Sequence, residues 1–268
     1  METLPAPLKG KIALVTGASR GIGAAIAEKI VYHGCTHIAL TYVSNPKLAA
    51  EVEQRIHSIN PNIKTVAFAM DVCDPNCGEL AVEQTLKGLG VDRIDILVSN
   101  AAMAGTSSFQ TIEEMTKEWW DSMMTANIWA PFTLARECAK FMPRGGRIIV
   151  LSSANSKLAM GDPFLAYCVA KAGGDALVRN LAATFGVQKG ITVNSISVGP
   201  VETDALRESF AAKGPEFEAM AHKWPLLQRI GQPEEVANIV AFVASPGASY
   251  IHGNQIPANG GGLAMLQG

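Results

Sequence analysis

Tyr167 and Lys171 are the residues of this 268-residue sequence whose types and spacing most directly suggest acid–base chemistry. Residues four apart on a helix project from one face, so a helix here would place the lysine ammonium beside the phenol. A free tyrosine, with a pKa of about 10, is a poor acid–base catalyst at neutral pH. A neighbouring ammonium stabilises the phenolate, so we expect Lys171 to lower the pKa of Tyr167. The pair alone is weak evidence, because surface helices often carry this spacing.

A second group of residues could hold a nucleotide. The segment T-G-A-S-R-G-I-G, Thr16 to Gly23, follows a short apolar run at 11–16 and precedes a helical pattern. Gly17 permits a sharp turn, and Gly21 and Gly23 let a pyrophosphate approach the backbone, where a helix N-terminus attracts it. The Gly-x3-Gly-x-Gly spacing differs from the G-x-G-x-x-G fingerprint. An ordinary glycine-rich loop is the alternative, but the strand and helix on either side favour a nucleotide site.

The strand expected at His37 to Tyr42 bears on which nucleotide binds. An NAD site usually places a carboxylate at the end of this strand, where it binds the ribose 2′-hydroxyl. Here the sequence continues through Ser44 without an acid, and Arg20 lies inside the glycine loop. A cation and hydroxyls without a carboxylate favour a 2′-phosphate, and hence NADP(H). The alternative for Arg20 is a solvated surface charge.

Taken together, these motifs resemble the short-chain dehydrogenase/reductase family across nearly the whole chain. Several ordered motifs at the right spacings are more specific than any one of them. The resemblance lies in T-G-A-S-R-G-I-G at Thr16, Asp71-Val72, S-N-A-A at Ser99, Asn127, Ser153, Y-C-V-A-K at Tyr167, G-P-V-E-T at Gly199 and G-N-Q-I-P-A-N-G-G at Gly253. It implies an NADP(H)-dependent ketoreductase that moves a hydride between the nicotinamide and a ketone or secondary alcohol of a small apolar biosynthetic intermediate.

The family pattern implies a role for each matching residue. Tyr167 would exchange a proton with the substrate oxygen, and Ser153 would hydrogen-bond that oxygen. Lys171 would bind the nicotinamide ribose, and Asn127 would hold a water that connects Lys171 to solvent. The residues expected to contact the cofactor are Asp71 and Val72 at the adenine, Val201 and Thr203 at the nicotinamide carboxamide, and Gly17, Ser19, Arg20, Gly21, Ile22, Gly23, Tyr42, Ser44, Asn100, Ala101, Tyr167 and Lys171 along the remainder.

The sequence departs from the family pattern in three places. S-N-A-A replaces the usual N-N-A-G, and Val198-Gly199 replaces the usual P-G. Ser153 lies fourteen residues before Tyr167 rather than the commoner thirteen, which makes Ala154 the alternative register; the longer spacing is similar to that of fungal naphthol-type ketoreductases of polyketide pathways. Two other functions stay open: a non-redox dehydration, epimerisation or cyclisation on the same scaffold, and a non-catalytic NADP-sensing regulator. The intact Ser153, Tyr167 and Lys171 argue against both.

The elements that must position these residues alternate along the chain. Apolar strands are expected at 11–16, 37–42, 65–70, 94–98, 147–151 and 192–196. One helix is expected directly after the glycine turn, and another after the second strand, ending at about residue 58. Further helices are expected at 79–88, at 112–141 with a break, at 167–185 and at 233–244. This order predicts an α/β fold: a Rossmann-type, doubly wound parallel sheet with helices on both faces, as one NADP-binding domain over 1–268. Within it, Gly214-Pro215 interrupts a helical pattern at 202–225, which we interpret as a substrate lid, with a static helical pair as the alternative.

Composition excludes several classes of protein. Hydrophobic residues make up 48 % and charged residues 17 %, which excludes a disordered chain. The net charge of −2 argues against nucleic acid as a partner. No apolar run approaches the ~20 residues that span a bilayer, so no membrane association is expected. The low charge and the family resemblance suggest a homotetramer, or at least a dimer.

Three smaller expectations concern the N-terminal segment, the cysteines and histidines, and three apolar residues near the expected pocket. Met1 to Pro5 is acidic and contains proline, unlike a signal peptide. The five scattered cysteines are expected to be free thiols in a reducing, cytoplasmic compartment, and neither they nor the histidines show the spacing of metal ligands. Met103, Met160 and Phe164 flank the expected pocket, and could either line it or pack behind it.

Overall fold

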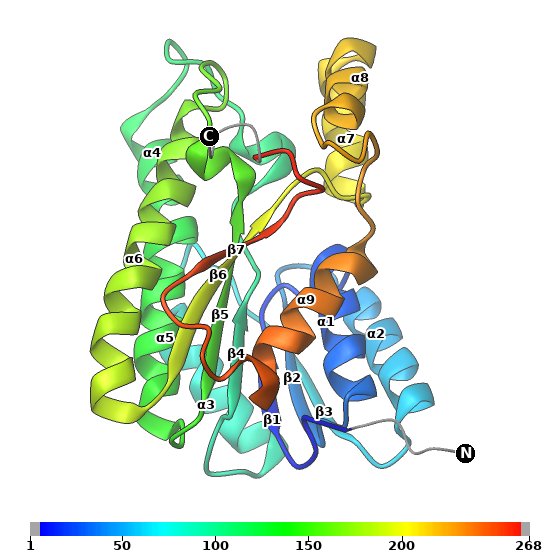
Figure 1. Ribbon diagram of the computed structural model, residues 1–268, viewed down its shortest axis with the longest axis vertical. Coiled ribbons are helices and arrows are strands. Elements are labelled where there is room, and N and C mark those ends of the chain that lie inside the picture. The colour runs from blue at the N-terminus through cyan, green and yellow to red at the C-terminus, as the bar shows by residue number, and fades with distance from the viewer. Residues whose placement is uncertain (1–5, 264–268) are drawn as a thin grey trace.

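The computed structural model describes residues 6–263, so Met1 to Pro5 lies outside the described residues. In this part of the chain, seven parallel strands form one sheet in the order β3-β2-β1-β4-β5-β6-β7 (Figure 1). The strands are β1 (Ile12–Val15), β2 (His37–Tyr42), β3 (Lys64–Ala69), β4 (Ile96–Ser99), β5 (Arg147–Ser153), β6 (Thr192–Val198) and β7 (Gln255–Ala258). The chain runs outward from β1 to β3 and then returns to β4 on the other side of β1. That reversal opens a crevice at the carboxyl ends of the strands, where ligands bind in such sheets.

Helices cover both faces of the sheet, as the sequence predicts. The helices are α1 (Gly21–Tyr32), α2 (Pro46–Ile59), α3 (Cys77–Leu89), α4 (Lys117–Met124), α5 (Ala130–Phe141), α6 (Leu165–Lys189), α7 (Asp204–Lys213), α8 (Pro215–Lys223) and α9 (Pro233–Ala244). One buried core joins α1, α2 and α9 to the sheet, and a second joins α3, α5 and α6 to its opposite face (Figure 1). The predicted doubly wound α/β fold is therefore confirmed.

The helical segment expected at 112–141 is divided by a π-helical turn, η2 (Thr125–Trp129). Its first helix begins at Lys117, because the Thr116 hydroxyl accepts a hydrogen bond from the Trp119 N–H at 3.2 Å and so caps the helix. The break predicted from the sequence is this π turn between α4 and α5. Such turns often occur at functional sites, and this one carries Asn127.

The sequence pattern did not predict the last strand, β7. Q-I-P-A is too short to show a period, and it contains Pro257, which lacks a backbone N–H. A proline is tolerated here because β7 is an edge strand that pairs with β6 alone.

The two helices within 202–225 stand beyond the carboxyl ends of the strands, at the upper right of Figure 1. They meet at Gly214, whose φ of +85° ends α7 and whose successor, Pro215, begins α8. The predicted interruption of the helical pattern is thus located correctly.

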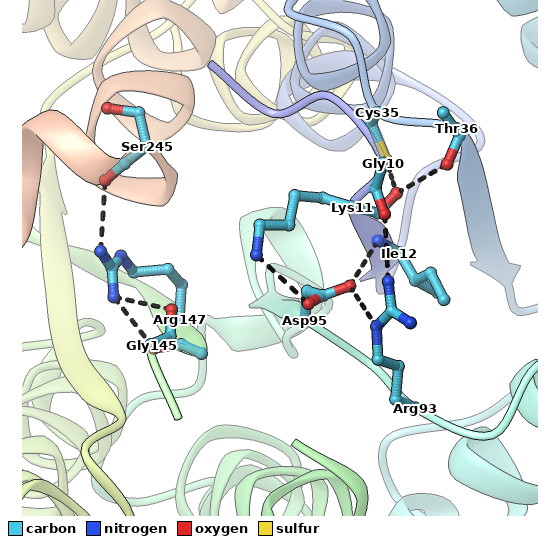
Figure 2. Close-up of polar contacts among 11 residues, drawn as sticks. Gly10, Lys11, Ile12, Cys35, Thr36, Arg93, Asp95, Gly145, Arg147 and Ser245 are labelled. Atoms are coloured by element: carbon cyan, nitrogen blue, oxygen red, sulfur yellow. Dashed lines mark hydrogen bonds and ion pairs between the residues drawn. The ribbon is translucent and has the colours of Figure 1, made fainter. Parts of the chain in front are cut away.

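Polar contacts join the amino ends of the strands, at the end of the sheet opposite the crevice (Figure 2). The buried Asp95 carboxylate accepts a hydrogen bond from the Ile12 N–H at 3.0 Å and pairs with the side chains of Lys11 and Arg93. This cluster ties β1 to the segment that leads into β4, the two strands between which the chain reverses. It therefore holds together the two strands whose carboxyl ends border the crevice.

No helix within residues 6–263 has the length and apolar character needed to cross a bilayer. In the same residues, no group of three or more histidine, cysteine, aspartate and glutamate side chains is arranged to hold a metal ion. All five cysteines are free.

Candidate active site

A cavity of about 680 Å³ lies at the carboxyl ends of the strands. The loops that follow β1, β2, β3, β4, β5 and β6 all contribute to its wall, and α7 and α8 cover one side. Sixteen of the residues singled out from the sequence line it: Gly17, Ser19, Arg20, Gly21, Ile22, Gly23, Tyr42, Ser44, Val72, Asn100, Ala101, Ser153, Tyr167, Lys171, Val201 and Thr203. Two do not, Asp71 and Asn127.

The glycine loop is shaped to let a ligand reach the backbone. Gly17 has a φ of +62°, and a Cβ there would come within 3.1 Å of the Asn100 amide nitrogen. That amide donates to the carbonyls of Thr16 and Gly17, at 2.9 and 3.1 Å, and so holds the loop against the turn after β4. Helix α1 begins at Gly21 with no side-chain cap and no acidic residue in its first turn. Its N–H groups and partial positive charge are therefore available to a phosphate.

At the end of the cavity near β2, the cation Arg20 lines the wall, and neither β2 nor the turn after it carries a carboxylate. Tyr42, Ser44 and Asn45 line this part of the wall, and Arg20 extends from the glycine loop beside them, half exposed. The Arg20 guanidinium lies 3.7 Å from Asp204 and 3.9 Å from Glu208, both on α7. The residues present thus fit a dinucleotide with a 2′-phosphate, since glycine cradle, helix N-terminus and cation share one wall.

Asp71, predicted to contact the adenine, is not among the residues that line the cavity. It is exposed, and its carboxylate accepts a hydrogen bond from the Cys73 N–H at 2.8 Å within the turn after β3. Its neighbour Val72 is buried and does line the cavity. Successive residues in this turn point in different directions, so one of the pair faces the cavity and the other faces solvent.

Ser153, Tyr167 and Lys171 meet on the wall opposite the glycine loop. Ser153 ends β5, and Tyr167 and Lys171 stand one turn apart near the start of α6. The Ser153 hydroxyl lies against the Tyr167 hydroxyl, and the Lys171 ammonium lies 5.7 Å from the centre of the tyrosine ring. Lys171 is buried, and its Nζ donates a hydrogen bond to the Leu151 carbonyl at 3.1 Å. Ala154, the alternative register for Ser153, has no hydroxyl to offer.

The titration of Tyr167 differs from the sequence-based expectation. Burial raises the pKa of Tyr167 to about 12, and the hydrogen bond with Ser153 offsets only part of this. Burial also lowers the pKa of Lys171 to about 8. Burial rather than Lys171 sets the direction of this shift, and the lowering expected from the ammonium is not seen in the protein alone. Tyr167 is consequently held in its protonated form at neutral pH, as a proton donor must be.

Asn127 lies behind this wall. Its Nδ2 donates to the carbonyls of Met103 and Met123, each at 3.1 Å, while its Oδ1 is buried without a hydrogen-bond partner among the described residues. A second small cavity, of about 10 Å³, is bounded by Asn127, Ser152 and Lys171. A buried acceptor of this kind beside the lysine suits the bound water that the family pattern implies.

Apolar side chains make up the part of the cavity beyond Tyr167. Met160 and Phe164 line it, whereas Met103 packs in the core behind, which resolves the alternatives left open by the sequence. Among the lining residues that sequence reasoning missed are Ser108, Phe109 and Trp224. The first two belong to an irregular segment around η1 (Gly105–Ser108), so no periodic pattern could have marked them.

The comparisons with known proteins agree with this geometry. Residues 17–262 match the family model described as "Enoyl-(Acyl carrier protein) reductase". The chain is 38 % identical to the short chain dehydrogenase asqE of Emericella nidulans, over 99 % of this chain and 98 % of that protein. The chain belongs to the short-chain dehydrogenase/reductase family.

Two other members of the family add detail. The hydroxynaphthalene reductase arp2 of Aspergillus fumigatus is 35 % identical, over 92 % of this chain and 90 % of its own. The solved structure of the angucycline C-6 ketoreductase LanV with bound NADP superposes with a TM-score of 0.85 at 33 % identity, covering 96 % of this chain and 97 % of that one. This short-chain dehydrogenase/reductase is accordingly an oxidoreductase that acts on a ketone or the corresponding alcohol, as the sequence predicted.

Proposed function

We propose that this protein is an NADPH-dependent ketoreductase whose substrate is a small, apolar and aromatic biosynthetic intermediate. The observation that carries the proposal is that Ser153, Tyr167 and Lys171 line the same cavity as the glycine loop. NADPH, when bound, supplies the hydride that reduces the carbonyl carbon. The protein supplies the position of both molecules and the proton.

In this proposal each polar residue acts at a stated atom. The Ser153 hydroxyl donates a hydrogen bond to the carbonyl oxygen, and the Tyr167 hydroxyl gives that oxygen its proton. Lys171 binds ribose hydroxyls through its ammonium, and its positive charge stabilises the phenolate that remains on Tyr167. Asn127 holds a water through its unpartnered Oδ1, and this water connects Lys171 to solvent.

Support for an aromatic substrate comes from the rings beyond Tyr167. Phe164 lies 4.8 Å from Phe109 in an edge-on arrangement and 5.9 Å from Phe217 with the two planes 22° apart, measured between ring centres. These rings come from three separate segments: Phe109 directly follows η1, Phe164 precedes α6, and Phe217 lies on α8. Flat aromatic molecules make favourable stacked and edge-on contacts with such rings. The one charged group on the cluster among the described residues is the Lys213 ammonium, 5.1 Å from the centre of the Phe109 ring.

A carbonyl panel tests the proposed function. NADPH oxidation is measured with quinones, aryl ketones, β-ketoesters and steroids. We expect turnover with quinones and aryl ketones to exceed that with β-ketoesters, which offer no ring to the phenylalanine cluster. Consumption of an aryl ketone without oxidation of NADPH would instead identify the non-redox alternative.

The segment 202–225 is expected to act as a lid over the substrate. Leu206, Phe217 and Met220, from both of its helices, line the cavity, so closure would exclude water from the reacting carbonyl. Trypsin should therefore cut the free protein after Arg207 and Lys213, which are exposed, and saturating NADPH should slow both cuts.

Cleavage after Arg144 serves as the internal control for this experiment. Arg144 is exposed in the turn before β5, at the opposite end of the sheet, so NADPH should leave this cut unchanged. Equal rates at Arg207 with and without NADPH would favour the static helical pair, and substrate selection would then rest on Met160 and Phe164.

We infer that the chain forms a homotetramer. Its helices α5 and α6 lie on one face of the sheet and expose large apolar side chains, including Phe141 at 41 % and Val169 at 47 %. Static light scattering should report four chains at micromolar concentration, and Val169→Asp should yield smaller species. Tyr32→Asp is the matched control, since this half-exposed residue lies on α1, on the other face. A monomeric wild-type protein would contradict the inference.

A further inference from the structure

Asp175 carries a buried carboxylate that the mechanism above does not use. It lies on α6, one helical turn after Lys171, and its side chain is only 6 % exposed. No lysine, arginine or histidine within residues 6–263 forms an ion pair with it at 4 Å or less. A carboxylate buried without a salt bridge is costly, so its place in the fold calls for a physical reason.

Hydrogen bonds from two strands fix this carboxylate. The Ser195 hydroxyl, on β6, donates to its Oδ1 at 2.8 Å, and the Gln255 side-chain amide, on β7, donates to its Oδ2. The same amide nitrogen lies 2.8 Å from the hydroxyl of Ser156 in η3 (Ala154–Lys157), the turn that directly follows Ser153. These hydrogen bonds hold the carboxylate in one position.

Lys171 has few other charges around it. On its own helix, the titratable neighbours are the neutral Tyr167, the thiol of Cys168 and the carboxylate of Asp175. From β5 and the π turn, the small cavity beside its ammonium receives only uncharged groups, such as Ser152 and Asn127. The carboxylate of Asp175 raises the pKa of Lys171, against the larger effect of burial.

We propose that Asp175 is a positioning residue of the active site, whose fixed and buried carboxylate keeps Lys171 positively charged. The inference rests on the proposed function, because it is Lys171 that binds the ribose and stabilises the Tyr167 phenolate. An uncharged lysine would bind the ribose hydroxyls less strongly and would not stabilise the phenolate. The strands β6 and β7 thereby contribute to the chemistry, although Ser195 and Gln255 lie outside the cavity lining.

The test measures how the NADPH dissociation constant varies with pH, from quenching of tryptophan fluorescence. In the wild-type protein, affinity should fall as pH rises through the Lys171 pKa of about 8, because the ammonium loses its proton. Asp175→Asn should move the midpoint of this fall toward lower pH by about one pH unit. At pH values well below both midpoints its affinity should match the wild-type value, since the lysine is charged in both proteins.

Two further variants separate charge from structure. Ser195→Ala removes one hydrogen bond to Asp175 and leaves the charge, so its midpoint should stay close to that of the wild type. The double variant Asp175→Asn/Gln255→Glu restores a carboxylate–amide pair across the same hydrogen bond but places the charge on β7 instead of α6. Its midpoint should recover toward the wild-type value, because a buried carboxylate is present again beside the original place. A midpoint no higher than that of Asp175→Asn would overturn the proposal, and if the single variant does not fold, a midpoint a full pH unit below the wild-type value would do so.

The remaining outcomes are equally decisive. If Asp175→Asn binds NADPH more weakly at every pH with an unmoved midpoint, Asp175 is merely structural and the proposal is overturned while the proposed function stands. If the wild-type protein binds no NADPH at any pH, the proposed function itself fails, and this inference fails with it.

Discussion

Replacing Tyr167 with phenylalanine should lower kcat for ketone reduction by about 10²–10⁴-fold, the usual contribution of a positioned general acid. The variant lacks only the hydroxyl that gives the substrate oxygen its proton. Its ring should still occupy the half-buried site on α6, next to the cluster of Met123, Ala166 and Ala170. NADPH affinity, measured by fluorescence titration, should therefore stay close to that of the wild type.

Tyr250→Phe is the matched control for this experiment. Tyr250 is fully exposed and is not among the residues that line the cavity, so loss of its hydroxyl should leave kcat unchanged. Turnover of Tyr167→Phe within about threefold of the wild-type value would remove general acid catalysis by this residue from the mechanism. A loss of NADPH binding equal to the loss of turnover would instead assign Tyr167 to the cofactor site.

Combining Arg20→Ala with Tyr42→Asp should shift the cofactor preference from NADPH toward NADH. The first change removes the cation expected to meet the 2′-phosphate, an interaction of about 1.5–3 kcal/mol for a charged hydrogen bond, or roughly 10- to 150-fold in affinity. The second places a carboxylate at the end of β2, where it can accept a hydrogen bond from the ribose 2′-hydroxyl and repels a phosphate. The measurement is the ratio of the two dissociation constants, by fluorescence titration with each nucleotide.

The carboxylates near Arg20 provide the control. Glu208 lies 3.9 Å from the guanidinium, and Glu208→Gln removes this competing charge while Arg20 stays in place. The control should bind NADPH at least as tightly as the wild type. An unchanged ratio of dissociation constants in the double variant would show that Arg20 is a solvated surface charge.

Local sequence was enough to locate the parts of the cavity wall that depend on backbone geometry. Gly17 must adopt a positive φ, and the apolar strand before it and the helix after it are recognisable from a window of about a dozen residues. The spacing of Tyr167 and Lys171 likewise fixes their common helical face, whatever else the chain does. For the same reason the Gly214-Pro215 break between α7 and α8 was visible in advance.

The environment of those residues depended on contacts between distant segments. The Tyr167 pKa rises because the assembled chain removes the phenol from water, an effect that the Tyr–Lys spacing does not reveal. Asp71 and Val72 are adjacent in sequence, yet only the valine reaches the cavity. The edge strand β7 exists because β6 offers it hydrogen-bonding groups, since four residues with a proline show no strand pattern by themselves.

The sequence by itself therefore determined the alternation of strands and helices, the glycine turn after β1 and the common helical face of Tyr167 and Lys171, because each depends on neighbouring residues and on hydrogen bonds within one element. Only the tertiary structure decided how those residues ionise and what surrounds them. Asp175 contacts Gln255 from 80 residues away, and the phenylalanine rings come from segments more than 50 residues apart. Burial and the charges of a folded site are sums over all nearby atoms, and chain folding alone determines which atoms are near.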